Sequence, residues 1–175
     1  MNRTLPKKIH IIGSVGSGKT TLAKELSAKL AIPYHELDNV VWKRCKTGDI
    51  RRTVEEREDF LSVIIMSDSW IIEGVHTEAW VANNIKHAEI IIFLDTSYKV
   101  RIYRIFKRFI LQKLKMEQAH YKPTFEIFLK MIKWNRYFEE VEKPNFFTQY
   151  EDYWDKFLIV SNKEELNCLF ELDKK

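Results

Sequence analysis

The chain has 175 residues, of which 45% are hydrophobic and 31% are charged, and its formal net charge is +4. This length fits a single domain, and the composition excludes a disordered or fibrous protein. The small net charge does not by itself indicate DNA or membrane binding. No apolar run reaches the roughly 18 residues of a membrane span, so we expect a cytoplasmic protein without a membrane partner. We expect either a monomer or a dimer.

The first predicted elements are a strand, a glycine-rich turn and a helix. Residues 8–12 form a short apolar run that predicts a strand, and residues 20–30 carry apolar side chains at helical spacing. Residues 34–37 then predict a second short strand, which closes on Asp38.

Between the second and third strands the sequence predicts an insertion over about residues 39–67. Its first part, to Arg52, is an irregular basic stretch. The following Thr53-Val-Glu-Glu56 is a capping box, which predicts an amphipathic helix through about Met66.

The rest of the chain alternates predicted strands with predicted helices. We expect strands at residues 70–72, 89–94 and 157–160, and helices at residues 97–115, at residues 124–141 and after Ser161. This alternation predicts a parallel sheet with helices on both faces. The expected fold is an α/β three-layer sandwich in one domain, residues 1–175, with five parallel strands in the order 2-3-1-4-5.

The turn after the first predicted strand satisfies the Walker A pattern. The expected nucleotide-binding residues are Gly13, Ser14, Val15, Gly16, Ser17, Gly18, Lys19, Thr20 and Thr21. The glycines let backbone N–H groups turn inward at the positive end of the next helix, forming an anion-binding nest. Lys19 supplies positive charge for the β- and γ-phosphates, and the Thr20 hydroxyl is a Mg²⁺ ligand. We therefore expect a P-loop NTPase fold that binds ATP or GTP with Mg²⁺. A Rossmann dinucleotide site is excluded, because its glycine spacing differs.

Further segments follow the phosphate loop in the order found in a known kinase family. They are His35-Glu-Leu-Asp38 with Trp42 soon after it, Trp70-Ile-Ile-Glu-Gly74, Ile91-Ile-Phe-Leu-Asp95, and Arg104 with Arg108. Together they make the chain resemble the adenylate-kinase-like P-loop kinases, and among them the small proteins labelled DNA topology modulation or flagellar regulators. The resemblance implies transfer of the γ-phosphate to an unidentified small-molecule acceptor, such as a nucleoside, a nucleotide or a hydroxylated metabolite.

Glu73-Gly74 stands where nucleoside monophosphate kinases have an Asp-Gly pair at the end of the third strand. The resemblance implies that Glu73 is a magnesium ligand through water, or a base near the acceptor; a helix-capping or surface carboxylate is the alternative. Those kinases follow the pair with an aromatic residue, a proline and an arginine that grips the acceptor. Here Val75, His76 and Thr77 follow instead, which argues against a nucleoside monophosphate acceptor.

The resemblance also implies an acceptor pocket near the end of the second strand. Asp38 would accept a hydrogen bond from the acceptor hydroxyl and orient it for attack, or it is a turn-forming residue before Asn39. Trp42 would line the pocket, or it is an ordinary buried aromatic. Asp95, which ends the fourth strand, is expected to be structural.

Arg104 and Arg108 are four residues apart, so they project from one face of the predicted helix. The resemblance implies a small helical lid over about residues 109–123, with Arg104 over the nucleotide base and Arg108 at the transferred phosphate. A solvated basic face is the alternative. Arg136, on a later helix, would add a phosphate contact. The expected catalytic residues are thus Lys19, Asp38, Glu73, Arg104 and Arg108, and the expected acceptor pocket is formed by Asp38, Trp42, Glu73 and Arg136.

A competing hypothesis comes from the same basic helix. Residues 99–115 contain seven Lys or Arg and no acidic residue, interleaved with Tyr103, Phe106 and Phe109. A basic aromatic helix is typical of proteins that bind nucleic-acid backbone, but no DNA-binding motif is visible, and a lid over a triphosphate needs the same charges. A small-molecule kinase is therefore favoured over an NTP-binding regulator without phosphotransfer, and over a direct DNA binder.

Overall fold

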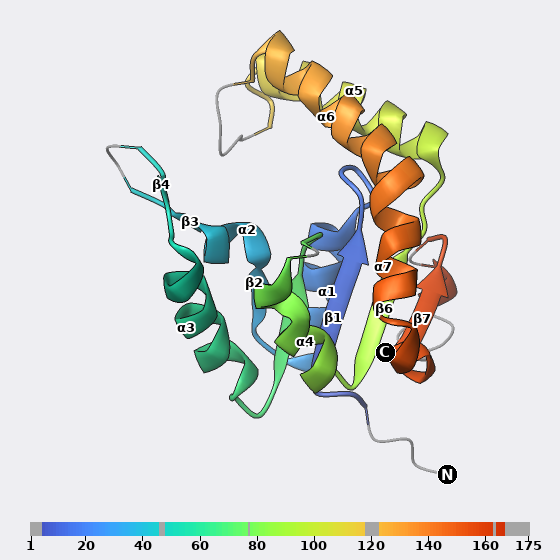
Figure 1. Cartoon of the computed structure of the whole chain (residues 1–175). Helices are drawn as coiled ribbons and strands as arrows, with labels where there is room; N and C mark the ends of the chain where they lie inside the picture. The colour runs from blue at the N-terminus through green and yellow to red at the C-terminus, as the bar shows by residue number, and fades with distance from the viewer. Residues whose placement is uncertain (1–4, 46–47, 77, 118–122, 163, 167–175) are drawn as a thin grey trace.

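The centre of the molecule is a five-stranded parallel sheet (Figure 1). The computed structural model describes residues 5–45, 48–76, 78–117, 123–162 and 164–166. The sheet consists of β1 (Lys8–Gly13), β2 (Tyr34–Glu36), β5 (Trp70–Glu73), β6 (Ile90–Leu94) and β7 (Phe157–Val160). Their order is β2-β5-β1-β6-β7, with parallel pairing throughout. Counted within this sheet, the order is 2-3-1-4-5, so the predicted fold is confirmed.

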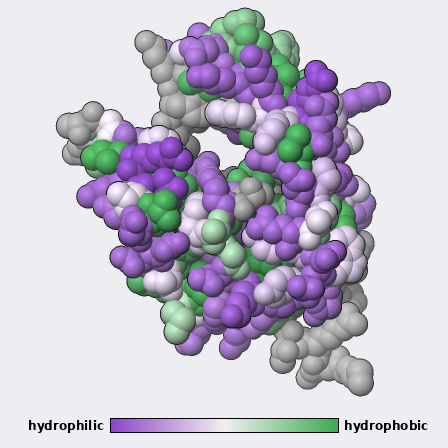
Figure 2. All heavy atoms as spheres, in the orientation of Figure 1, coloured by the Kyte–Doolittle hydropathy of each residue, from purple (hydrophilic) through white to green (hydrophobic). Residues whose placement is uncertain are grey.

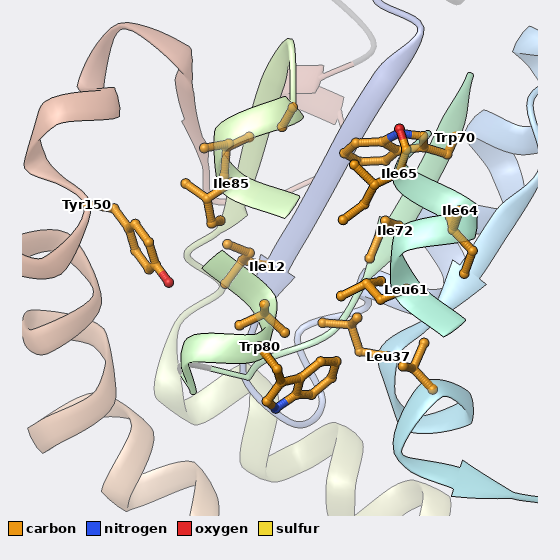
Figure 3. Packing of buried hydrophobic residues seen from close by; sticks show 14 of the residues in the cluster. Ile12, Leu37, Leu61, Ile64, Ile65, Trp70, Ile72, Trp80, Ile85 and Tyr150 are labelled. Carbon is orange, nitrogen blue, oxygen red and sulfur yellow. The ribbon is translucent and has the colours of Figure 1, made fainter. Parts of the chain in front are cut away.

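The central strands are buried on both faces, because helices cover each side. Side chains alternate between the two cores: Ile9 and Ile11 of β1 belong to one cluster, and Ile12 belongs to the other. The first cluster packs under α1 (Lys19–Leu30). The second packs against α3 (Val54–Ile65), η1 (Ala79–Val81), α4 (Ala82–His87) and α7 (Lys143–Gln149). Figure 3 shows this second cluster, with Ile72 of the sheet close to Leu61 of α3.

The insertion after β2 is more ordered than the sequence predicts. β2 ends at Glu36, and the fully buried Leu37 begins the short helix α2 (Leu37–Val41). The expected irregular stretch is wrong in part, since β3 (Trp42–Lys43) and β4 (Ile50–Arg51) pair antiparallel. Gly48, shortly before β4, has a φ of 125°, and its N–H donates a hydrogen bond of 3.1 Å to the carbonyl oxygen of Cys45. The capping box of Thr53 and Glu56 at the start of α3 is confirmed.

Two helices project beyond the carboxyl ends of the strands (Figure 1). They are α5 (Tyr98–Lys113) and α6 (Phe125–Tyr137). The two helices pack against each other through aromatic rings, such as those of Phe109 and Phe128, whose centroids are 4.8 Å apart. The expected lid at about residues 109–123 falls partly on this hairpin and partly on residues 118–122, which lie outside the described residues. Whether the hairpin acts as a lid stays a prediction.

The expected continuous helix over residues 124–141 is interrupted. The α-helix ends at Tyr137, and a π-helical segment, η2 (Phe138–Glu142), joins it to α7. Pro144 explains part of this break, because it has no N–H to donate to the carbonyl of Glu140. None of the described helices is long and apolar enough to cross a bilayer.

Candidate functional site

The phosphate loop connects β1 to α1 with its backbone turned toward the helix N-terminus. Gly16 has a φ of 79° and Gly18 a φ of 101°, a region that glycine adopts readily. A Cβ at Gly16 would lie 2.9 Å from the carbonyl oxygen of Arg101, so the loop lies directly against α5. No side chain caps the N-terminus of α1. Its first N–H groups are thus suited to an anion such as a nucleotide phosphate.

Thr20, the second residue of α1, contacts the end of β5. Its hydroxyl donates a hydrogen bond of 2.6 Å to Oε1 of Glu73. Glu73 is only 4% exposed, and its Oε2 has no hydrogen-bond partner in the described part of the chain. Burial raises the pKa of Glu73, with Glu36 and Asp38 adding to the increase while Lys19 and Thr20 oppose it. The carboxyl group is therefore poorly compensated in the protein alone.

This pair fits a magnesium ion. Mg²⁺ prefers oxygen ligands, and in phosphotransfer sites it usually takes one or two from the protein and the rest from phosphates and water. The hydroxyl of Thr20 and the unpartnered Oε2 of Glu73 are oxygen ligands of this kind. Among the described residues, no group of three or more His, Cys, Asp or Glu side chains could hold a metal on its own. A bound nucleotide would have to supply the remaining ligands.

A cavity of about 460 Å³ opens beside the phosphate loop. Its described lining is Ser14, Val15, Lys19, Asp38, Glu73, Gly74, Val75, His76, Glu78, Trp134, Tyr137, Phe138 and Glu142. Figure 2 shows the opening as a hollow between the α5–α6 hairpin and the part of the molecule that carries α2 and the β3–β4 hairpin. The cavity brings together Lys19, Asp38 and Glu73, three of the residues that the sequence singled out.

Asp38 lies on α2 and faces His76, which follows β5. The Nε2 atom of His76 is 3.4 Å from Oδ1 of Asp38, and its Nδ1 atom is 3.3 Å from Oε2 of Glu78. The hydrogen bond from His76 is the main cause that lowers the pKa of Asp38, and Lys19 acts in the same direction against the effect of burial. Because the Asp38 side chain is 73% exposed, its charged neighbours and solvent outweigh the effect of burial on its pKa. Asp38 is thus an ionised carboxylate at the mouth of the cavity.

Arg104 of α5 lies over the opposite part of the phosphate loop. Its Nη1 donates hydrogen bonds to the carbonyl oxygens of Ser17, at 2.7 Å, and Gly16, at 3.3 Å. A second cavity of about 350 Å³ lies here and shares no described lining residue with the first. It is lined by Ser17, Gly18, Thr21, Leu22, Leu94, Thr96, Arg104, Asn162 and Glu164. The loop therefore has an open space on each side.

Three predicted site residues that lie away from the phosphate loop in sequence are also absent from the described lining of both cavities. Arg108 lies between α5 and α6, with Nη2 3.5 Å from Sδ of Met131. Trp42 lies on the β3–β4 hairpin, with Arg51 over its ring. The side chain of Arg136 is 71% exposed and pairs with Glu140 on its own helix. The structure does not bring these three side chains to the phosphate loop.

Two buried side chains near the loop were missed by the sequence analysis. Asn135 of α6 is fully buried and accepts a hydrogen bond of 2.9 Å from the hydroxyl of Ser14. Arg101 is also fully buried and pairs with Glu139 of η2. Arg101 could be seen only as one charge of a basic helix, and Asn135 had no distinguishing signal.

Asp95, at the end of β6, belongs to an ion-pair group in this region. Its Oδ1 is 2.6 Å from Nζ of Lys143, which also lies 3.5 Å from Oε1 of Glu139. Glu139 in turn pairs with Arg101. These contacts connect the sheet, η2 and α5 close to the phosphate loop, in agreement with the structural role expected for Asp95.

Comparison with known proteins gives one family match and one relative. A family model described as an AAA domain matches residues 9–120. The uncharacterized protein YqaC of Bacillus subtilis (strain 168) is 29% identical over 102 residues. That alignment covers 58% of this chain and 56% of YqaC, so the match spans little more than half of that relative.

Solved structures share the fold over nearly the whole chain. A shikimate kinase from Acinetobacter baumannii in complex with shikimate has a TM-score of 0.57 at 18% identity, covering 98% of this chain and 97% of that one. A shikimate kinase from Bacteroides thetaiotaomicron has a TM-score of 0.53 at 18% identity, covering 95% and 99%. An uncharacterized protein from Eubacterium ventriosum ATCC 27560 has a TM-score of 0.54 at 17% identity, covering 95% and 98%. These TM-scores show a common P-loop kinase-like fold. The comparisons do not extend to the narrower resemblance to DNA topology modulation proteins.

Proposed function

The chain belongs to the AAA domain family, and from this premise we propose that it is a phosphotransferase that moves the γ-phosphate of ATP or GTP to a hydroxyl group of a small molecule. One observation supports this function above the others. The phosphate-loop lysine, Lys19, lines the same cavity as two carboxyl groups, Asp38 and Glu73, with space for an acceptor between them. A protein that only binds a nucleotide does not need that space.

The nucleotide would lie across the phosphate loop. Backbone N–H groups at the start of α1 and the charge of Lys19 would hold the phosphates. Thr20 and Glu73 would hold Mg²⁺, which neutralises charge on the β- and γ-phosphate oxygens when bound. The base would occupy the second cavity, where Arg104 lies.

The acceptor would lie in the first cavity, with its hydroxyl directed to Asp38. Its oxygen attacks the γ-phosphorus, the bond from that phosphorus to the β,γ-bridging oxygen breaks, and the nucleoside diphosphate leaves. The hydroxyl proton passes to the carboxylate of Asp38, which is ionised and exposed enough to return it to water. His76 positions Asp38 through the contact between Nε2 and Oδ1.

The solved structures that share this fold are consistent with a small-molecule acceptor. Two of them are shikimate kinases, one of which contains shikimate. At 18% identity this likeness supports a class of reaction and says nothing of which molecule is the acceptor.

A second candidate function is an NTP-dependent regulator that contacts nucleic acid, as the resemblance to DNA topology modulation proteins implies. Its support is the exposed face of α5, where Tyr103 is 63% and Phe106 49% exposed beside the exposed Lys107. Arg101 and Arg104 of the same helix are engaged within the protein, which leaves fewer charges for a phosphate backbone.

A coupled ADP-release screen tests the proposed function. Purified protein with Mg²⁺ and ATP or GTP is mixed in turn with nucleosides, nucleotides and hydroxylated metabolites. We expect turnover that rises with one acceptor and is lost in Lys19→Ala. Nucleotide binding without any acceptor-dependent turnover would favour the regulator instead, and a gel-shift that weakens steeply with salt would identify a nucleic-acid binder.

A further inference from the structure

The described lining of the first cavity holds more acidic than basic side chains. Four carboxyl groups line it, from Asp38, Glu73, Glu78 and Glu142, against one lysine and one histidine. No arginine is found in the described lining. Once nucleotide phosphates engage Lys19, the part of the cavity left for the acceptor is strongly acidic.

The acidic groups gather around His76. This side chain contacts Oδ1 of Asp38 on one side and Oε2 of Glu78 on the other, at 3.4 and 3.3 Å. Glu142 lies close to the same group: burial raises its pKa, Glu78 raises it further, and His76 opposes the increase. Glu78 and Glu142 therefore repel each other across the cavity, and a positive charge placed between them would relieve that repulsion.

A second, independent observation is the buried Oε2 of Glu73. Glu73 is 4% exposed and lines the cavity. Its Oε2 has no hydrogen-bond partner among the described residues. A carboxylate oxygen in this condition needs a cation or a donor. Mg²⁺ is the expected partner at Glu73, whereas the ion pairs of the described residues give Glu78 one partner, His76, and give Glu142 none.

Aromatic rings form another wall of the cavity. Trp134 and Tyr137 are three residues apart on α6, so they lie on neighbouring positions of one helix face, and both line the cavity. They are 54% and 53% exposed, which leaves ring surface open to a ligand. An ammonium group over an aromatic face gains a cation–π attraction.

An anionic acceptor does not fit this lining. A carboxylate or phosphate in a kinase acceptor pocket is normally held by arginine, whose guanidinium makes paired hydrogen bonds to two oxygens. Here Arg136 pairs with Glu140 at the surface, and Arg52 donates to the carbonyl oxygen of Asn39. Arg44 pairs with Asp49, and its charge also lowers the pKa of Asp38, after the larger effect of His76. An anion would face four carboxyl groups, with Lys19 and His76 as the only basic side chains in the described lining.

We propose that the acceptor is a small hydroxylated amine, protonated at neutral pH, whose ammonium group binds between Glu78 and Glu142 against Trp134 and Tyr137 while one hydroxyl faces Asp38. This inference rests on the proposed phosphotransferase function and specifies its substrate class. The chemistry is the O-phosphorylation described above: the hydroxyl oxygen forms the new bond to the γ-phosphorus, the nucleoside diphosphate leaves, and the ammonium group keeps its proton throughout.

Two matched sets of probes test the charge preference in the ADP-release assay with Mg²⁺ and ATP. Serinol, glycerol and glycerate are three-carbon alcohols that are cationic, neutral and anionic. Glucosamine, glucose and glucuronate form the same series on a six-carbon sugar. We expect kcat/KM to be at least about tenfold higher for the amine than for the neutral and anionic members of the better set.

The variants Glu142→Gln and Glu78→Gln test the binding site for the ammonium group. Each should raise KM for the amine about tenfold and leave kcat within about threefold, because the lost contact is made equally in the ground and transition states. Glu151→Gln, an exposed carboxylate outside the described lining, is the matched control and should change neither value. Circular dichroism checks that each variant folds. If only one of the two glutamine variants folds, its kinetics are sufficient to test the site.

The outcomes separate this inference from the phosphotransferase proposal. A preference for amines that Glu142→Gln or Glu78→Gln weakens supports both. Turnover that prefers a neutral or anionic probe overturns the amine inference and leaves phosphotransfer standing. If no probe stimulates turnover, calorimetry with Mg²⁺ and a non-hydrolysable ATP analogue decides. Selective amine binding that the variants weaken then supports the cation site and contradicts phosphotransfer, while equal or absent binding of all probes overturns the inference.

Discussion

Ser14 of the phosphate loop donates a 2.9 Å hydrogen bond to Oδ1 of Asn135, which lies 121 residues further along the chain in α6. Both side chains are buried, with exposures of 1% and 0%. The contact ties the α5–α6 hairpin directly to the loop that would hold the nucleotide. A change in the hairpin would therefore reach the phosphates through this pair.

Asn135→Ala should destabilise the protein and weaken nucleotide binding. It removes the partner of a buried hydroxyl, which costs about 1–3 kcal/mol. The measurements are urea denaturation and calorimetry with Mg-ATP. Asn83→Ala, at an exposed position of α4, is the control and should change stability by less than about 0.5 kcal/mol. Equal effects of the two substitutions would show that the contact with Ser14 has no energetic role.

Glu73→Gln should stabilise the nucleotide-free protein at neutral pH. Burial raises the pKa of Glu73 in the folded state, so folding disfavours its charged form. That cost is fully present above the folded-state pKa, declines as the pH falls from there toward the ordinary pKa of a glutamate, and is gone below the latter, where the carboxyl is protonated in both states. The stability difference between variant and wild type should shrink in the same direction. Denaturation at a series of pH values measures it, and a difference that does not change with pH would contradict the prediction.

The same substitution should weaken magnesium-dependent nucleotide binding. Glutamine can still accept the hydrogen bond from Thr20, but it has no charge to offer Mg²⁺. Loss of a group that supports a metal site typically costs about 10- to 100-fold in affinity. Titration of ATP with and without Mg²⁺ separates the metal effect, since affinity for metal-free ATP should be unchanged or higher.

Mg-ATP should raise the melting temperature of the wild-type protein. At about a hundred times its dissociation constant, a ligand stabilises the folded state by about 2.7 kcal/mol, roughly 5–11 °C for a domain of this size. Lys19→Ala should remove most of this shift, because its ammonium group is the point charge for the β- and γ-phosphates. A wild-type protein that shows no shift with millimolar ATP or GTP would exclude the phosphate loop as a nucleotide site.

Arg104→Ala and Arg108→Ala should have different effects. Arg104 contacts Ser17 and Gly16 and lines the second cavity, so its loss should mainly weaken nucleotide binding. Arg108 is expected at the transferred phosphate, so its loss should lower kcat by about 10²–10³ with nucleotide affinity nearly intact. In this structure Arg108 lies beside Met131, so the second effect requires the side chain to reorient. Steady-state kinetics in which both variants stay within about threefold of wild type would identify these arginines as structural or surface charges.

Asp38→Asn should reduce kcat by about 10²–10⁴ with a smaller effect on KM for the acceptor. Asparagine keeps the shape and can still bond to His76, but it cannot take the hydroxyl proton. The pH profile provides the check: hydrogen bonding from His76 lowers the pKa of Asp38, so wild-type activity should persist below the usual range for an aspartate-dependent enzyme. Wild-type kcat in the variant would exclude Asp38 as the base.

Local patterns in the sequence predicted most of the fold and the centre of the site. The five strands, the phosphate loop and the capping box of Thr53 depend on residues that are near one another in the chain, so spacing alone identifies them. The resemblance to a kinase family singled out Asp38 and Glu73, which lie just after and at the carboxyl ends of two parallel strands. The β3–β4 hairpin was missed because each strand has only two residues, too few for a periodic pattern.

The tertiary structure alone decided what surrounds that centre. Asn135 reaches Ser14 only because α6 folds back over the loop, and nothing near either residue in sequence encodes the contact. Trp42 and Arg136 were assigned to the acceptor pocket by resemblance, while the cavity is lined instead by Glu78 and Glu142, from segments of the chain that precede η1 and end η2. The charge of a pocket is a sum over side chains from many elements, so it is determined by how those elements pack and not by any one stretch of sequence.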